Sequence, residues 1–317
     1  MGAGNSTHTS TYWLCPLYSL DCDCESVNLA EGIQIKAAPS KLREYLKERT
    51  HHLYGLRSNL SDVHWAAFLP YRRRNVEGLS VDETFLIGFE EHDRDRNSFV
   101  DLVTALRLYR SGRLVAGPLI FASIHDLEWS VGGSTIWTPV SELNFFQEEP
   151  KYVLHQSDVP KVNKLLQSIR QWRQISVLDT VNIALTRFHS AYHGNIEDRI
   201  IDQMIAFESL YIGDERGIKK KLALRTACLL GESQALRNEI FNDMKDAYEK
   251  RCNIVHVIED VTREELGRIT PKTEEYLRQS IRKFLLLLSQ GHSLKEIRDK
   301  LLDENILKNG EPLAFRE

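Results

Sequence analysis

Arg251 and His256 stand five residues apart in the run KRCNIVHV, residues 250–257. An arginine binds phosphate through its planar guanidinium, and a histidine is the natural acid or base near neutral pH. Cleavage of RNA by its own 2′-hydroxyl needs both functions, a proton acceptor and a cation for the developing charge. The spacing R-x4-H is common by chance, so the pair alone is a weak signal for a nuclease.

Helical periodicity predicts that both residues lie on one helix, at about 233–258. Its core-facing seam is expected to hold Ile240, Met244, Tyr248, Arg251, Val255 and Ile258, with Arg251 as the one charge. At roughly 100° per residue, five steps place Arg251 and His256 about 140° apart on a straight helix. The two side chains would reach one phosphate if the helix bends, or if a second copy of the chain contributes its own pair.

A carboxylate, Glu208, falls in the middle of an apolar stripe on the predicted helix 195–212. Burial of an unpaired ionised carboxylate costs several kcal/mol, so Glu208 is expected to have a cation or several donors beside it. Two interpretations follow: a structural ion pair inside the helical bundle, or a carboxylate that orients a catalytic arginine.

Basic residues that could hold RNA cluster near the start of the predicted helix 217–230: Lys219, Lys220, Lys221 and Arg225. A second set, Arg278, Arg282 and Lys283, lies on the predicted helix 263–289. Residues 1–160 carry 15 Lys+Arg against 21 Asp+Glu, which leaves 26 against 24 of the totals of 41 and 45 for residues 161–317. The chain is therefore not basic throughout, and an RNA site must be a local patch in the C-terminal half.

The composition is that of a globular protein: 317 residues, 42% hydrophobic and 27% charged, which excludes wholesale disorder and a coiled-coil rod. The longest apolar run, residues 284–288, is far short of the roughly 20 residues of a membrane span, so no membrane partner is expected. Five cysteines and no visible secretory signal predict a reduced cytoplasmic protein. Cys15, Cys22 and Cys24 lack an evident fourth ligand, so neither a metal nor another cofactor is expected.

The fold class is predicted as α+β, with a boundary in the stretch 150–160 that two prolines bracket. Residues 1–155 are expected to form a strand-rich mixed domain, and residues 156–317 an all-α bundle. Helices are predicted at 161–174, 176–191, 195–212, 217–230, 233–258, 263–289 and 293–304. In the first domain, strands are predicted at 84–89 and 112–121, a hairpin that turns at Gly132 and Gly133, and helices at 98–109 and 39–53.

Three blocks in the second domain resemble the HEPN superfamily, specifically the Apea-like HEPN domains of bacteria. They are EDRIIDQMIAFESLY at 197–211, KLALRTACLLG at 221–231 and KRCNIVHV at 250–257. Their order and spacing over about 70 residues are much more specific than the R-x4-H pair. The segment 101–112, DLVTALRLYRSG, also looks like the N-terminal region of many such proteins.

The resemblance implies an up-and-down helical bundle that forms a homodimer and places two R-x4-6-H motifs in one cleft. It implies metal-independent endoribonuclease activity, typical of toxins and anti-phage defence systems. On this chain Arg251 would bind the scissile phosphate and His256 would transfer the proton, with Asn253 and Glu208 in support. In this hypothesis the N-terminal domain binds a trigger or regulator of the nuclease, or itself restrains the nuclease.

The chain departs from the HEPN pattern at two positions beside the motif. Cys252 follows the arginine, where Asn, Asp or His is usual, and Val257 follows the histidine, where Apea-like members often have glycine. These departures favour an alternative, a catalytically silent HEPN module that binds RNA or a protein partner. A third hypothesis is an unrelated helical scaffold with a zinc-binding N-terminus.

Overall fold

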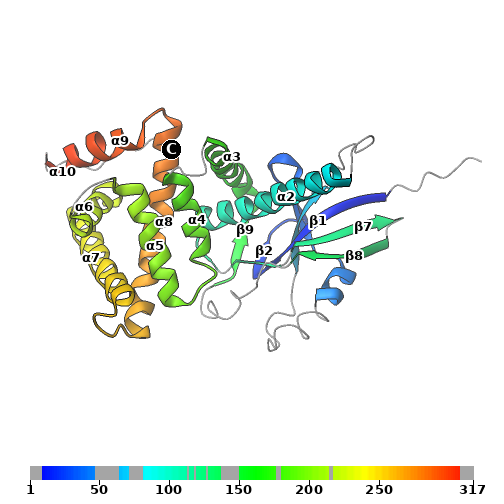
Figure 1. The fold of residues 1–317 in the computed structure, drawn as a ribbon, viewed down its shortest axis with the longest axis horizontal. Helices are drawn as coiled ribbons and strands as arrows, with labels where there is room; N and C mark the ends of the chain where they lie inside the picture. The colour runs from blue at the N-terminus through cyan, green and yellow to red at the C-terminus, as the bar shows by residue number, and fades with distance from the viewer. Residues whose placement is uncertain are drawn as a thin grey trace, which may run out of the picture. The chain divides into compact units, whose positions relative to one another are not determined.

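The structure is a computed structural model that describes residues 9–46, 64–70, 81–112, 114–117, 119–125, 128–136, 150–175, 180–213 and 217–307. The chain divides into two compact units, Met1–Leu166 and Gln167–Glu317. The first unit contains a β-sheet with a long helix packed against it, and the second unit is helical. This agrees with the predicted α+β class (Figure 1).

The first unit is built on an antiparallel sheet. Its strand order is β3 (Ser26–Asn28), β4 (Gln34–Ala37), β5 (Trp65–Pro70), β1 (Thr9–Tyr18), β7 (Leu119–His125) and β8 (Glu128–Ile136). The short β6 (Val115–Ala116) also pairs with β1, and β2 (Leu20–Cys22) pairs in parallel with β9 (Tyr152–Leu154).

Helix α2 (Val81–Tyr109) supplies apolar side chains to the core of this unit. Phe99, Leu102, Val103 and Leu106 cluster with residues of β1 and β4. The helix predicted at 98–109 is confirmed as the second part of α2, but the strand predicted at 84–89 is wrong, because these residues are helical. A short apolar run of this kind does not by itself distinguish a strand from a buried helical turn.

The turn predicted at Gly132 and Gly133 is also wrong. Both residues lie inside β8, which pairs with β7 along its length (Figure 1). The register changes between Ile120↔Thr135 and Ala122↔Val131, so the strand has an irregularity at the two glycines. Glycine inside a strand is often found at such a bulge. Of the other predicted elements, the strand within 112–121 is confirmed by β6 and β7, and residues 40–46 of the 39–53 helix are helical; residues 47–53 lie outside the described residues.

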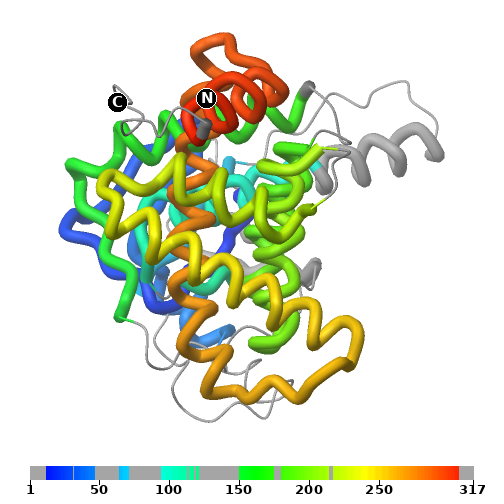
Figure 2. The backbone as a smooth tube through the Cα atoms, turned by 90° about the vertical axis from the view of Figure 1, so that its left-hand side faces the viewer, coloured from blue at the N-terminus to red at the C-terminus, as the bar shows by residue number. Residues whose placement is uncertain are grey.

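The helices predicted between residues 161 and 289 are confirmed where the structure describes them, and α3 (Val159–Ile175) continues from the first unit into the second. They are α3, α4 (Thr180–Ser190), α5 (Ile196–Tyr211), α6 (Ile218–Leu230), α7 (Gln234–His256) and α8 (Arg263–Ser289), followed by α9 (Leu294–Glu296), a π-helical segment Ile297–Asp303 and α10 (Glu304–Leu307). Figure 2 shows α6 and α7 running together in yellow and leading into α8 in orange. Side-chain caps at Asn195, Ser233 and Thr262 begin α5, α7 and α8.

The division of the chain falls within α3, later than the predicted boundary at 155/156. The difference arises because segments after residue 155 pack into the first unit. Asp158 accepts a hydrogen bond from Tyr109 at 2.6 Å, and Val159 and Val162 belong to the core that contains α2. The polar stretch between the prolines is thus part of that unit.

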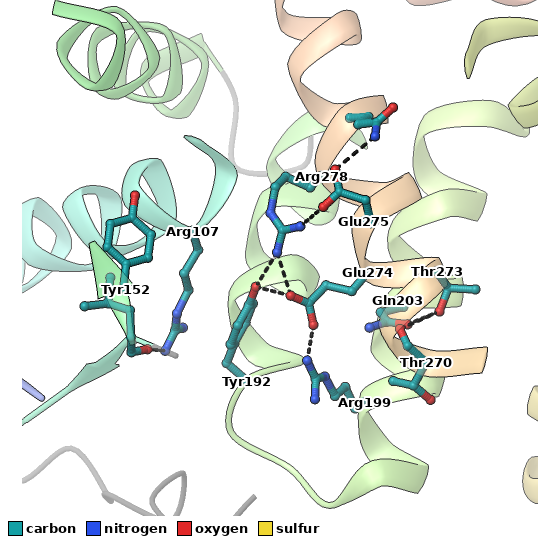
Figure 3. Close-up of polar contacts among 12 residues, drawn as sticks. Arg107, Tyr152, Tyr192, Arg199, Gln203, Thr270, Thr273, Glu274, Glu275 and Arg278 are labelled. Carbon is teal, nitrogen blue, oxygen red and sulfur yellow. Dashed lines mark hydrogen bonds and ion pairs between the residues drawn. The ribbon is translucent and has the colours of Figure 1, made fainter. Parts of the chain in front are cut away.

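A buried carboxylate on α8, Glu274, holds three segments of the second unit together (Figure 3). Arg278 donates to it at 2.7 Å, and the Tyr192 hydroxyl, which follows α4, donates at 2.5 Å. Arg199 of α5 forms an ion pair with its other oxygen. Burial by itself raises the pKa of Glu274, but the charges of Arg199 and Arg278 outweigh burial and lower it below its ordinary value.

We expect Glu274→Gln to destabilise the fold by about 3–5 kcal/mol, because it removes the carboxylate that two buried guanidinium groups share. Glu275→Gln is the matched control: Glu275 also pairs with Arg278, but its side chain is 44% exposed, so its loss should cost at most about 1 kcal/mol. Urea denaturation at pH 7 measures both.

The same pair of variants has a defined pH dependence. Because folding lowers the pKa of Glu274, its stabilising effect is complete above the ordinary value of 4.5 and is lost as the pH falls through the folded value. The difference in the free energy of unfolding between wild type and Glu274→Gln should therefore become smaller as the pH falls below 4.5. Equal stability of Glu274→Gln and Glu275→Gln at pH 7 would contradict the central position of Glu274.

Candidate functional site

Arg251, Asn253 and His256 all lie on α7, one continuous helix that ends at His256. The helix repeat therefore separates the Arg251 and His256 side chains by about 140° around the axis. His256 is exposed, whereas Arg251 is half-buried, with its Nε in the protein interior and without a hydrogen-bond partner among the described residues. Asn253 donates to the Glu259 carboxylate at 3.3 Å, so its amide is turned toward the connection between α7 and α8.

The Tyr248 ring is an aromatic neighbour of Arg251, whose guanidinium lies 6.0 Å from the ring centroid. Burial raises the pKa of Tyr248, and the nearby negative charge of Glu208 raises it further. Arg251, Tyr248 and Glu208 thus lie in one region where α7 faces α5.

The predicted ion pair of Glu208 is absent from the part of the chain that the structure describes. Glu208 is half-buried, and its Oε1 lies in the interior without a hydrogen-bond partner there. The buried carboxylate with paired cations is Glu274 instead. Glu208 lies beside the Tyr248 phenol, a neutral neighbour in place of a cation.

The predicted core-facing seam of α7 is only partly buried. Ile240 and Met244 are buried as expected, but Val255 and Ile258 are 43% and 63% exposed. The buried charge of α7 is Lys250, which was not predicted; it pairs with Glu265 at 2.9 Å. The last turn of α7 thus carries apolar side chains into solvent.

The predicted RNA-binding residues separate into two groups. Arg225 is fully buried, where it donates to both oxygens of Asp303 at 2.8 and 2.7 Å and to the carbonyl of Tyr211. Its guanidinium therefore attaches the π-helical segment to α5 and α6 and is not accessible to RNA. Arg278 is also buried, in the Glu274 cluster, and Lys283 donates to the carbonyl of Leu229.

Lys219 and Lys220, in contrast, line a groove of about 880 Å³ between the start of α6 and the middle of α7; Lys221 does not line it. The groove is lined by Gly217, Lys219 and Lys220 from one side and by Phe241, Lys245 and Tyr248 from the other. Phe241, Lys245 and Tyr248 were not predicted as site residues. Their i, i+4, i+7 spacing places them on one face of α7, a signal that the sequence does contain.

Val257 forms the C-cap of α7 in the left-handed conformation, with φ of 51°. This conformation is strained for a β-branched side chain. Glycine, which the Apea-like members often have after the histidine, adopts it without strain. Val257 is also 89% exposed, so no packing within the described residues of the chain requires its side chain.

No metal site is found in the described part of the chain: no three His, Cys, Asp or Glu side chains there are grouped to hold an ion. None of the five cysteines, Cys15, Cys22, Cys24, Cys228 and Cys252, forms a disulfide. The zinc-binding hypothesis therefore gains no support from these residues. Among the described helices, none combines the length and apolarity needed to cross a bilayer.

Comparisons with known proteins add no relative: no protein-family model, curated protein or solved structure matches the chain.

We expect Val257→Gly to raise the free energy of unfolding by about 1 kcal/mol, because glycine removes the left-handed strain at this C-cap. Val257→Ala keeps the strain while it also shortens the exposed side chain, and serves as the control. Thermal unfolding at low protein concentration compares the two variants. If Val257→Gly and Val257→Ala have the same melting temperature, the cap at residue 257 is not strained.

Proposed function

We propose that the chain is a metal-independent endoribonuclease of the HEPN type, active as a homodimer. The observation that carries the proposal is the course of α7: one of its faces runs from the lysine-lined groove to the exposed His256, with the half-buried Arg251 beside it. Phosphate-binding cations, an aromatic side chain and a histidine that can exchange protons are thus available along one helix.

The chemistry needs only the RNA and these side chains. A neutral His256 removes the proton of a 2′-hydroxyl, and the 2′-oxygen attacks the adjacent phosphorus. Arg251 stabilises the negative charge on the non-bridging oxygens. The bond from phosphorus to the 5′-oxygen breaks, and that oxygen takes a proton from a protonated histidine, which leaves a 2′,3′-cyclic phosphate and a 5′-hydroxyl.

Two features of the end of α7 support the proposed homodimer. Arg251 and His256 of one copy lie about 140° apart around α7 and cannot face the same phosphate. In a two-fold dimer, Arg251 of one copy can lie beside His256 of the other. Val255, Val257 and Ile258 present exposed apolar surface directly beside the motif. Contiguous exposed apolar residues of this kind are typical of protein–protein contacts.

The wider role follows from the resemblance to Apea-like HEPN proteins: anti-phage defence or toxin-like growth arrest in the cytoplasm. Five cysteines that form no disulfide agree with a reducing compartment. The first unit would then bind the trigger or regulator of the nuclease.

The alternative is a catalytically silent module that binds RNA or a protein partner. The half-buried position of Arg251 favours it, because a guanidinium with its Nε in the interior offers fewer donors to a phosphate. Cys252 and Val257 favour it as well.

Cleavage of a tRNA and total-RNA panel in EDTA separates the two functions. We expect wild type to produce fragments with cyclic-phosphate ends, and His256→Ala to lose at least about 100-fold in rate, the usual contribution of a general acid or base. His189→Ala is the control for the loss of a histidine elsewhere in the unit. Equal cleavage by wild type and His256→Ala would disprove the role of His256, and binding without cleavage would favour the silent module.

Light scattering tests the homodimer. We expect wild type at micromolar concentration to have twice the sequence mass of 36.6 kDa. The variant Val255→Asp/Ile258→Asp should be monomeric, because each substitution would bury an unpaired carboxylate at the interface. The same two changes at exposed polar positions, Ser289→Asp/Lys295→Asp, should leave the mass unchanged. A monomeric wild type would contradict the proposed dimer.

A further inference from the structure

The groove between α6 and α7 is not used by the Arg251–His256 chemistry, yet it combines two kinds of side chain that recognise nucleotides. Lys219 and Lys220 line it from α6, and Lys245 lines it from α7. Phe241 and Tyr248 add aromatic rings. Its volume of about 880 Å³ falls in the range of roughly 300–1,000 Å³ that is typical of small-molecule pockets, the size class of a nucleotide.

The positive charge in the groove is only partly compensated. Lys219 forms an ion pair with Glu249. Among the ion pairs of residues 217–307, none involves Lys220 or Lys245, and Lys245 lies 5.4 Å from the centroid of the Phe241 ring. The first turn of α6 contains no acidic residue. The helix N-terminus therefore adds its partial positive charge to that of the lysines, an arrangement that is unfavourable until an anion binds there.

The aromatic side chains make the groove more than an anion site. Bases stack on aromatic rings with little dependence on sequence, and lysines track the phosphates of a single strand. Tyr248 is half-buried and held between the groove and Arg251, which lies 6.0 Å from its ring centroid. A ring fixed on one side by protein and open on the other to a groove is suited to stack a base.

The groove also points toward the catalytic histidine. At 100° per residue, Tyr248, Cys252 and His256 follow each other at i, i+4 and i+8 on one side of α7. Tyr248 and His256 are about 12 Å apart along the axis at 1.5 Å per residue. A strand held in the groove would thus continue along α7 toward His256.

We infer that this groove binds one nucleotide of single-stranded RNA outside the scissile bond, with its phosphate on Lys220 and Lys245 and its base on Tyr248. The inference deepens the proposed function, on which it rests, by naming single-stranded RNA as the substrate class. The groove selects for an unpaired base, because a base within a duplex has no free face to stack on Tyr248.

Fluorescence anisotropy with a labelled 2′-O-methyl RNA 12-mer in EDTA tests the groove. This probe lacks the 2′-hydroxyl nucleophile, so binding is measured without cleavage. We expect Lys220→Glu/Lys245→Glu to weaken binding at least about tenfold and to reduce the slope of log K against log salt by about 0.7, the value for the one phosphate that the two lysines share. The control Lys295→Glu/Lys300→Glu makes the same charge change outside the groove and should bind as wild type.

The stacking role has its own variants. Tyr248→Leu should weaken binding by roughly 5- to 100-fold, whereas Tyr248→Phe keeps the ring and should stay within about twofold of wild type. In competition, a trinucleotide should displace the probe at lower concentration than tripolyphosphate. Equal competition would overturn the contact between base and Tyr248, and melting temperatures show whether each variant is folded.

The outcomes distinguish this inference from the proposed nuclease. His256→Ala should bind the probe as wild type does. If wild type binds through the groove but cuts no RNA, the nuclease is wrong and the groove stands. If the two double-lysine variants bind equally, or if wild type does not bind the probe at micromolar concentration, the groove inference is overturned, whatever the cleavage assay shows.

Discussion

The carboxylate of Glu274 is the charge around which the helical unit is arranged. Glu274 lies on α8, and its side chain is buried in the bundle. One arginine from the same helix and one from α5 neutralise its charge (Figure 3). Removal of these three charges from water is costly, and only mutual pairing with complete hydrogen bonding offsets that cost. The cluster therefore specifies which faces of α5 and α8 meet, since any other register would leave a charge unpaired. A second buried polar pair joins the same two helices: the Thr273 hydroxyl of α8 donates to the Gln203 side-chain oxygen of α5 at 2.5 Å, and both residues are fully buried. This hydrogen bond also requires the two helices to keep their register.

With α5 and α8 fixed, α7 has three faces with different roles. Ile240 and Met244 pack into the core, and Lys250 pairs with Glu265, whose pKa the Thr262 backbone and Lys250 lower to about 2. The face with Phe241, Lys245 and Tyr248 opens into the groove beside α6. The last turn has no cover from within the described residues, so His256 and the apolar side chains after it reach solvent. Chemistry at the end of such a helix is positioned by a rigid core and still accessible to a large substrate.

Local signals predicted most of this arrangement, and long-range pairing accounts for what they missed. The caps at Asn195, Ser233 and Thr262 and the glycine after α6 are adjacent in sequence to the helices they delimit, so the helices of the second unit were predictable. Glu208 and Glu274 look alike in sequence, as carboxylates within helical stripes. Whether such a carboxylate contacts a cation depends on residues far away in the sequence. Arg199, which pairs with Glu274, lies 75 positions before it. Arg225 failed as an RNA-binding candidate for the same reason, because Asp303 lies 78 positions further along the chain.

Val257 connects the energetics of the fold to the proposed dimer. Val257, a β-branched residue in a left-handed cap, destabilises the fold through backbone strain. Its side chain is exposed, so packing within the described chain does not compensate for that strain. Strain of this kind points to a use of the side chain outside the folded monomer. Apolar burial at about 25 cal/mol per Å² would more than offset strain of this size once Val255, Val257 and Ile258 are covered by a second copy. The same substitution that departs from the HEPN pattern would then strengthen the contact that brings Arg251 of one copy toward His256 of the other. Under the proposed function Val257 is therefore compatible with the nuclease, because its side chain would serve the interface and leave Arg251 and His256 in place.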